Sequence, residues 1–135
     1  MTTAATEAVQ AHSLEKSFGE WPVLWDLDLT VPWGQTLVIF GANGAGKTTL
    51  LRILSTHVRA DHGSVAVAGH SLRTRPEEAR RRIGVVGHRS LLYDDLTCRE
   101  NLIYYGRLFG LKDHRPRVDE VLEKVKLTSR ADHLV

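Results

Sequence analysis

Only one cysteine, Cys98, is present, so the chain can form no internal disulfide bond and no metal site built on paired cysteines. The sequence has no run of about 18 apolar residues, the length that a helix needs to span a bilayer. Residues 1–10 also lack the basic segment followed by an apolar one that marks a secretion signal. These absences predict a protein of the cytosol, where thiols stay reduced.

Neither charge nor histidine spacing indicates a specialised ligand. The 18 Lys and Arg residues against 16 Asp and Glu residues give a net charge of +2, and the basic excess comes from short stretches such as residues 73–82, so no nucleic-acid partner is expected. No two of the seven histidines have the three- or four-residue spacing that places two metal ligands on one helix face. The composition, with 42% hydrophobic and 25% charged residues, is typical of one globular domain.

The first two thirds of the chain mix predicted strands and helices. Apolar and polar side chains alternate in part over residues 23–31, which predicts a half-buried strand in an antiparallel layer. Residues 36–40 form a β-rich apolar run between two glycines and predict a fully buried strand. The spacing of leucine and isoleucine predicts a helix over residues 46–56. Further along, the patterns predict a short strand at residues 65–67, a helix over residues 76–82 and another buried strand at residues 83–86.

Beyond residue 94 the predicted structure is helical. Thr97 and Glu100 have the spacing of a capping box, in which the threonine oxygen accepts an amide hydrogen and the glutamate reaches back to the cap. A second helix is predicted from about Pro116, after a connection near Gly110. We therefore expect a helical hairpin at this end of the chain.

The segment 41–48 matches the phosphate-binding pattern G-x-x-x-x-G-K-[ST] at every fixed position, between a predicted strand and a predicted helix. Glycines let the backbone wrap with its amide hydrogens pointing inward, and the helix adds its positive end. Lys47 is suited to bridge the β- and γ-phosphates of ATP, Thr48 to bind Mg²⁺, and Thr49 to donate to the α-phosphate. The residues expected to contact the nucleotide are Gly41, Ala42, Asn43, Gly44, Ala45, Gly46, Lys47, Thr48 and Thr49.

The alternative is that this glycine-rich turn is only a tight connection between strand and helix. A full chance match in a chain of this length has odds of roughly one in a few hundred, because glycine makes up about 7% of residues on average. The position of the motif between a predicted strand and a predicted helix makes a chance match still less frequent. The sequence therefore predicts binding of ATP with Mg²⁺.

The stretch 41–51, GANGAGKTTLL, resembles the phosphate loop of ABC transporter ATPases in its asparagine, its alanine and its doubled threonine. Residues 16–19 and 31–35 resemble the opening strands of that family, in which an aromatic residue before a glycine stacks on adenine. Phe18 holds the matching position. The resemblance implies that Phe18 contacts adenine. If the resemblance is set aside, Phe18 could simply be an apolar residue that caps the sheet.

Residues 83–88 and 92–102 resemble the Q-loop of the family and the entry to its helical subdomain. One departure is His88, which stands where most members have the glutamine that reaches Mg²⁺ and the attacking water. A neutral histidine can hydrogen-bond water or coordinate a metal, so His88 is either an altered Q-loop residue or an ordinary loop histidine. The pair Gly87 and His88 resembles the haem-exporter ATPases of cytochrome c maturation.

The resemblance implies an α/β fold: a P-loop NTPase core with an N-terminal antiparallel β layer and the start of a helical subdomain. We expect residues 1–7 to be frayed, residues 8–94 to form the core and residues 95–135 the helical subdomain. The signature motif, the catalytic glutamate and the switch histidine of the family have no counterpart up to Val135. The chain is therefore expected to be an incomplete unit of marginal stability that binds ATP without hydrolysing it alone.

By the same resemblance, the expected function is that of the ATP-binding subunit of an ABC transporter. Two copies would close head to tail on ATP at the cytoplasmic side of the membrane, against a transmembrane subunit docked near the Q-loop. The alternatives are an ABC-type ATPase without a membrane partner, for which no basic arm or inserted domain is visible, and a catalytically silent ATP-binding fragment. The residues expected to face the membrane partner are Leu91, Leu92, Tyr93 and Tyr104, the last of which could equally be core.

Overall fold

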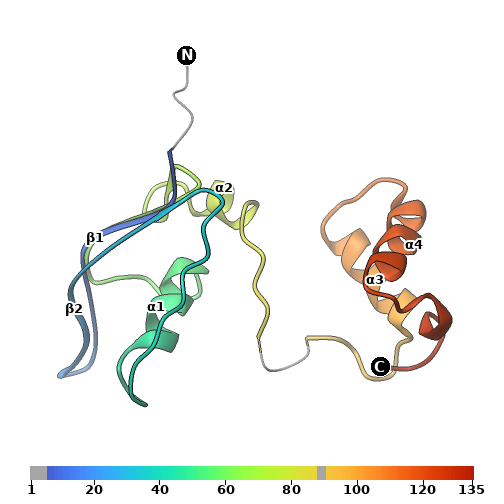
Figure 1. The fold of residues 1–135 in the computed structure, drawn as a ribbon, viewed down its shortest axis with the longest axis horizontal. Helices are drawn as coiled ribbons and strands as arrows, with labels where there is room; N and C mark the ends of the chain where they lie inside the picture. The colour runs from blue at the N-terminus through green and yellow to red at the C-terminus, as the bar shows by residue number, and fades with distance from the viewer. Residues whose placement is uncertain (1–5, 88–90) are drawn as a thin grey trace. The chain divides into compact units, whose positions relative to one another are not determined.

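The computed structural model describes residues 6–87 and 91–135 (Figure 1). The chain divides into two compact units, Met1–Val86 and Gly87–Val135. No helix of the described residues has both the length and the apolar composition needed to cross a membrane. Each unit is built around its own small core.

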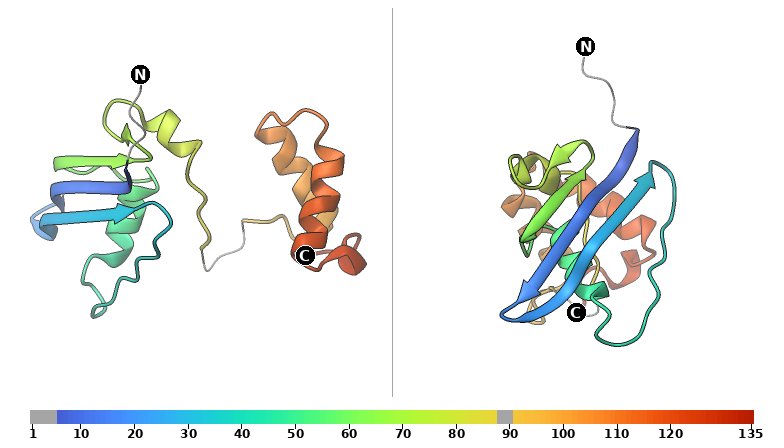
Figure 2. Two further views of the ribbon diagram at one scale, coloured as in Figure 1. Left: turned by 45° about the horizontal axis from the view of Figure 1, so that its top comes forward. Right: turned by 90° about the vertical axis from the view of Figure 1, so that its left-hand side faces the viewer.

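The N-terminal unit contains a four-stranded antiparallel sheet in the order β2-β1-β3-β4. Its two long strands, β1 and β2, form a hairpin closed by residues 19–20 (Figure 2). The predicted strands at residues 23–31 and 65–67 are confirmed and lie inside β2 and β3. The strands are β1 (Glu7–Phe18), β2 (Trp21–Pro32), β3 (His62–Val67) and β4 (His70–Ser71).

Helix α1 (Lys47–Leu54) lies against one face of this sheet (Figure 2). Leu50 and Ile53 point one way because residues three apart share a helix face. They pack with strand residues into a core whose buried members are Ala11, Leu14, Leu24, Leu50, Ile53 and Val65. The predicted helix over residues 46–56 is confirmed. So is the helix predicted over residues 76–82, observed as the shorter α2 (Pro76–Arg80) with proline in its first turn.

The two buried strands predicted at residues 36–40 and 83–86 are wrong. Neither segment is a strand, and both expose apolar side chains, with Phe40 88% exposed and Val86 fully exposed. A buried strand needs hydrogen-bonded neighbours on both sides, and no described residue outside the antiparallel sheet offers one. The apolar runs are real features of the sequence, but their partners are not among the described residues.

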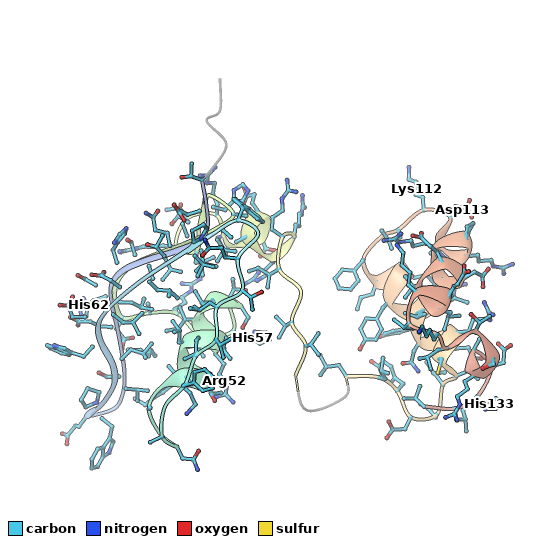
Figure 3. All side chains as sticks on the ribbon, in the orientation of Figure 1. Arg52, His57, His62, Lys112, Asp113 and His133 are labelled. Carbon is cyan, nitrogen blue, oxygen red and sulfur yellow. The ribbon has the colours of Figure 1, made fainter. Side chains whose placement is uncertain are left out.

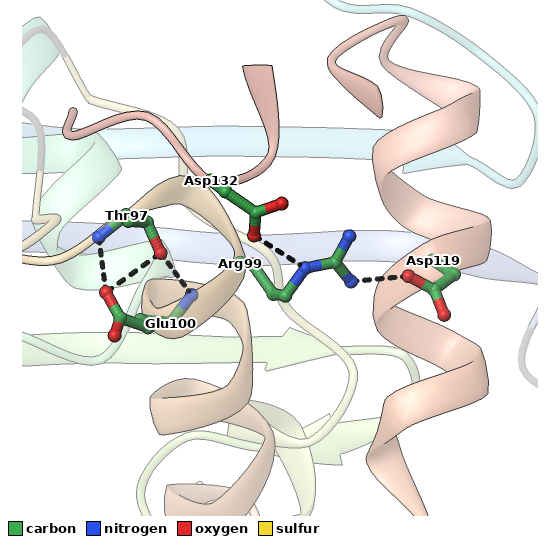
Figure 4. A network of polar contacts seen from close by, with 5 residues as sticks. All are labelled: Thr97, Arg99, Glu100, Asp119 and Asp132. Carbon is green, nitrogen blue, oxygen red and sulfur yellow. Dashed lines mark hydrogen bonds and ion pairs between the residues drawn. The ribbon is translucent and has the colours of Figure 1, made fainter. Parts of the chain in front are cut away.

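The C-terminal unit is a helical hairpin of α3 (Cys98–Leu108) and α4 (His114–Lys124), followed by the short helix η1 (Thr128–Arg130). Val118, Leu122 and Ala131 form its buried core. The predicted hairpin is confirmed, although α4 starts two residues before Pro116. Arg99 links α3 to α4 and to the segment after η1, because its guanidinium donates to Asp119 at 2.5 Å and to Asp132 at 3.0 Å (Figure 4).

The capping box predicted at the start of α3 is confirmed (Figure 4). The Glu100 amide donates to the Thr97 hydroxyl oxygen at 3.2 Å, and the Thr97 amide donates to the Glu100 carboxylate at 2.8 Å. Just behind it, Asn101 is 1% exposed. Its side-chain oxygen accepts from the Tyr93 amide at 2.8 Å, and its nitrogen lies within 3.0–3.2 Å of the carbonyls of Tyr93, Leu96 and Thr97. Asn101 thereby fixes the segment that leads into the hairpin.

Candidate functional site

The phosphate-loop motif forms a tight turn that ends in α1. Gly46 is the N-cap of the helix in the left-handed conformation, with φ of 82°, and its carbonyl accepts from Leu50 at 2.9 Å. A Cβ atom placed on Gly46 would lie 2.8 Å from both the Val23 carbonyl oxygen and the Leu24 side chain. Only glycine fits at this position, because both the backbone angle and the contact with β2 exclude a side chain.

Lys47, the first residue of α1, folds back over the loop. Its ammonium donates to the carbonyl oxygens of Gly41 at 2.7 Å and of Ala42 at 2.6 Å. These two bonds hold a positive charge beside the loop backbone. Thr48 is exposed and Thr49 is half-buried, so both hydroxyls lie in the first turn of the helix next to that charge.

The electrostatics of this site favour an anion. The first turn of α1 contains no acidic side chain, and its backbone amides have no partner within the helix. Two other potential cations of this region, Arg52 and His57, lie on the side of α1 away from the strands (Figure 3). The positive charge at the N-terminal end of α1 therefore comes from Lys47 and the helix end.

A magnesium ion would depend largely on the nucleotide for its ligands. Among the described residues no group of three or more His, Cys, Asp and Glu side chains could hold a metal. Mg²⁺ commonly keeps several waters and takes one or two protein ligands together with phosphate oxygens. The exposed Thr48 hydroxyl fits that requirement, whereas His88 lies outside the described residues.

Phe18 ends β1 with 46% of its surface exposed and is not part of the buried core. The Lys16 ammonium lies 5.3 Å from its ring centroid, within the range of a cation–π contact. The same ammonium donates to the Asp61 carboxylate at 2.6 Å, and the Ser17 amide donates to the other carboxylate oxygen at 2.8 Å. Sequence reasoning missed the pairing of Lys16 with Asp61, because the two residues are 45 positions apart in the chain and no local pattern links them.

The hydrogen bonds from Lys16 and then Ser17 lower the pKa of Asp61 below its ordinary value of 3.8. A lowered pKa means that the ionised carboxylate stabilises the folded unit above about pH 4, and that this contribution is lost as the pH falls through the lowered value. We expect Asp61→Asn to unfold at lower urea concentration than the wild type at pH 7, and the difference to disappear in acid. Glu20→Gln, in the hairpin turn, is the control. A difference that stays constant as the pH is lowered until the N-terminal unit unfolds in acid would contradict this linkage.

The four residues expected to face a partner lie together on the surface of the C-terminal unit. The rings of Tyr93 and Tyr104 are 5.0 Å apart and edge to face, with their hydroxyls at 3.2 Å. Tyr104 is 41% exposed, so it is not a core residue. Leu91 and Leu92 are exposed beside them, and the Tyr105 hydroxyl donates to the Leu91 carbonyl.

Comparisons with known proteins agree with the geometry. The family model described as ABC transporter matches residues 24–135. The daunorubicin resistance ATP-binding protein DrrA2 of Streptomyces coeruleorubidus is 45% identical over 127 residues, covering 93% of this chain and 39% of that protein. The Nod factor export ATP-binding protein I of Burkholderia lata is 37% identical over 126 residues, covering 92% of this chain and 41% of that protein.

A solved structure of an ATP-binding subunit of an ABC transporter matches with a TM-score of 0.79 and 25% identity, covering 94% of this chain and 54% of that one. The predicted fold class, an incomplete P-loop NTPase with an antiparallel β layer and helices, is therefore confirmed. The chain spans about two fifths of the length of the curated relatives that it matches.

Proposed function

This chain belongs to the ABC transporter family, and we propose that it is the ATP-binding portion of a subunit that couples ATP binding and hydrolysis to transport across a membrane. The observation that carries the proposal is the turn at residues 41–47, where Lys47 lies over the loop at the positive end of α1. Glycine at position 46 and the absence of acids from the first helical turn suit a polyphosphate.

In this proposal the loop amides and the first turn of α1 hold the phosphate chain. Lys47 exchanges its two carbonyl acceptors for oxygens of the β- and γ-phosphates, so that its ammonium keeps its hydrogen bonds and gains partners of opposite charge. Thr48 supplies one hydroxyl ligand to the Mg²⁺ that accompanies the nucleotide, and Thr49 donates to the α-phosphate. Lys47 would offset part of the charge on the transferring phosphoryl group, and Mg²⁺, when bound, would supply further positive charge there.

The remaining assignments follow from family membership. Phe18 stacks on adenine, and His88 takes the place of the Q-loop glutamine near the attacking water. Leu91, Leu92, Tyr93 and Tyr104 face a transmembrane subunit at the cytoplasmic side of the membrane, and two subunits close head to tail on ATP. Hydrolysis belongs to the whole protein. Relatives named for drug resistance and for Nod factor export favour an exporter.

The test is binding of a fluorescent ATP analogue with Mg²⁺ to the chain and to Lys47→Ala. We expect the substitution to weaken binding by about 10- to 100-fold, because hydrogen bonds to charged groups are worth roughly 1.5–3 kcal/mol. Lys112→Ala, an exposed lysine of the other unit, is the matched control and should bind as the wild type does (Figure 3).

Thermal unfolding of all three proteins accompanies the titration, since Lys47 also holds the loop carbonyls. Equal affinity of wild type and Lys47→Ala, with both folded, would refute the phosphate-site assignment. A folded wild type that does not bind would refute the proposed function for this chain.

A further inference from the structure

The turn that ends α1 holds a threonine in an unusual backbone conformation. Thr56 has φ of 65°, in the left-handed region, which is costly for a β-branched residue. The turn is a Schellman motif, in which the Thr56 amide donates to the Ile53 carbonyl at 2.9 Å and the next amide, that of His57, donates to the Arg52 carbonyl at 2.8 Å. Glycine is the usual residue at the left-handed position of this motif. The backbone therefore favours glycine over threonine here, and strained residues of this kind cluster at functional positions.

The hydroxyl of Thr56 connects α1 to α2. It accepts a hydrogen bond at 2.7 Å from Nε of Arg80, the last residue of α2. An ion pair with Glu77, one turn earlier on α2, also orients the Arg80 guanidinium. Glycine at position 56 would suit the backbone of the turn, but it could not make this contact.

The main chain of Arg80 holds the start of the segment that follows α2. Its carbonyl accepts from the Ile83 amide at 3.2 Å, and the Ala79 carbonyl accepts from the Arg82 amide at 2.9 Å. Ala79 is completely buried, so α2 is anchored in the N-terminal unit. Residues 83–86 are not part of the sheet, and the bond to Ile83 attaches them to the end of α2.

The opposite end of α1 is the candidate phosphate site. The helix has eight residues, and a helix this short is only marginally stable through its own backbone hydrogen bonds. A phosphate chain paired with the amides of the first turn suppresses fraying of the helix, since helical hydrogen bonds form cooperatively. Binding in the phosphate loop thereby also steadies the last turn of α1, which carries the Thr56 hydroxyl.

We propose that Thr56 and Arg80 are positioning residues that transmit occupancy of the phosphate loop to residues 83–86. The path runs along α1 to Thr56, from its hydroxyl to the Arg80 side chain, and from the Arg80 carbonyl to Ile83. The proposal rests on the proposed function, since it requires a nucleotide at residues 41–47. It also accounts for a threonine at a position where the backbone favours glycine.

The experiment is hydrogen–deuterium exchange with mass spectrometry of peptides that cover α1 and residues 80–86, with and without saturating Mg²⁺ and a non-hydrolysable ATP analogue. In the wild type, binding should slow exchange in both segments, by at least about fivefold over residues 80–86, which is the lower end of typical couplings between two sites. Thr56→Gly should keep the protection of α1 and lose that of residues 80–86. Its melting temperature should stay close to that of the wild type, because relief of the left-handed backbone offsets the lost hydrogen bond.

Two further variants isolate the Thr56 hydroxyl. Thr56→Ser keeps the hydroxyl and should show protection of both segments. Ser55→Ala removes the neighbouring hydroxyl, which lies 2.9 Å from Nδ1 of His57, and leaves the contact between Thr56 and Arg80 in place. It should therefore behave as the wild type does. Saturation and thermal unfolding are measured for every variant.

Protection of α1 without protection of residues 80–86 in the wild type would overturn this proposal and leave the proposed function standing. So would a Thr56→Gly protein that matches the wild type, or a Thr56→Ser protein that matches Thr56→Gly. A Thr56→Gly protein that melts at clearly lower temperature and protects neither segment would also overturn it, because Thr56 would then act through the fold. If the folded wild type showed no protection of α1, the proposed function would fail, and this inference with it.

Discussion

Replacing Gly63 by alanine is expected to destabilise the N-terminal unit by about 3 kcal/mol or more. Gly63 has φ of 82°, and a Cβ there would lie 2.3 Å from the Ser13 carbonyl oxygen and 2.5 Å from that of His12. These are backbone atoms of the neighbouring strand β1, so no side-chain rotation relieves the overlap. The methyl group can be accommodated only if β3 separates from β1, next to the core residues Ala11 and Val65.

The measurement is urea unfolding followed by tryptophan fluorescence, since all three tryptophans belong to the N-terminal unit. Gly34→Ala is the control: its φ of 77° carries the same backbone strain, but its Cβ would meet nothing within 4 Å. Gly34→Ala should be destabilised only by the backbone strain, which costs about 1–2 kcal/mol. If both variants lost the same stability, the contact with Ser13 would not be the cause.

Asn101→Ala is expected to destabilise the C-terminal unit by about 2–4 kcal/mol. The buried amide makes its four bonds to the backbone of Tyr93, Leu96 and Thr97. Removing it leaves the Tyr93 amide and several carbonyls without this partner, and it opens a small cavity behind the start of α3. The segment that carries Leu91 and Tyr93 loses its attachment at the same time.

Near-ultraviolet circular dichroism can follow this unit, because all three tyrosines lie in it. Asn101→Asp keeps the shape but replaces the donors with a buried carboxylate oxygen that faces three carbonyl oxygens, so at pH 7 it should be at least as destabilised as Asn101→Ala. Thr97→Ala removes only the cap and should cost about 1 kcal/mol. A tyrosine signal and a melting temperature unchanged in Asn101→Ala would contradict the role given to this side chain.

Features fixed by neighbouring residues could be predicted from the sequence, as the capping box at Thr97 and the glycine turn before α1 demonstrate. Both depend on residues three to eight apart. The strand β1 was harder to see because Ser13 adopts φ of 45° and shifts the register, which places the buried Ala11 and Leu14 three residues apart instead of two. A strand with such a bulge loses the alternation on which its prediction depends.

The features that could not be predicted from the sequence depend on contacts between segments far apart in the chain. Residues 36–40 and 83–86 have no strand to pair with among the described residues, so their apolar composition alone could not decide their structure. Likewise, no local pattern marks Asp61 as the partner of Lys16. The candidate site could thus be located from its motif, whereas the ion pair beside Phe18 emerged only from the structure.

The two bonds from Lys47 to the loop carbonyls also bear on which ions gain most from binding in the loop. The ammonium already has good oxygen partners, so an incoming ion gains only the difference between its own attraction and theirs. A phosphate chain offers several charged oxygens at once, and it also contacts the amides of the helix end. This arrangement therefore favours a multiply charged phosphate chain over a ligand with a single charge.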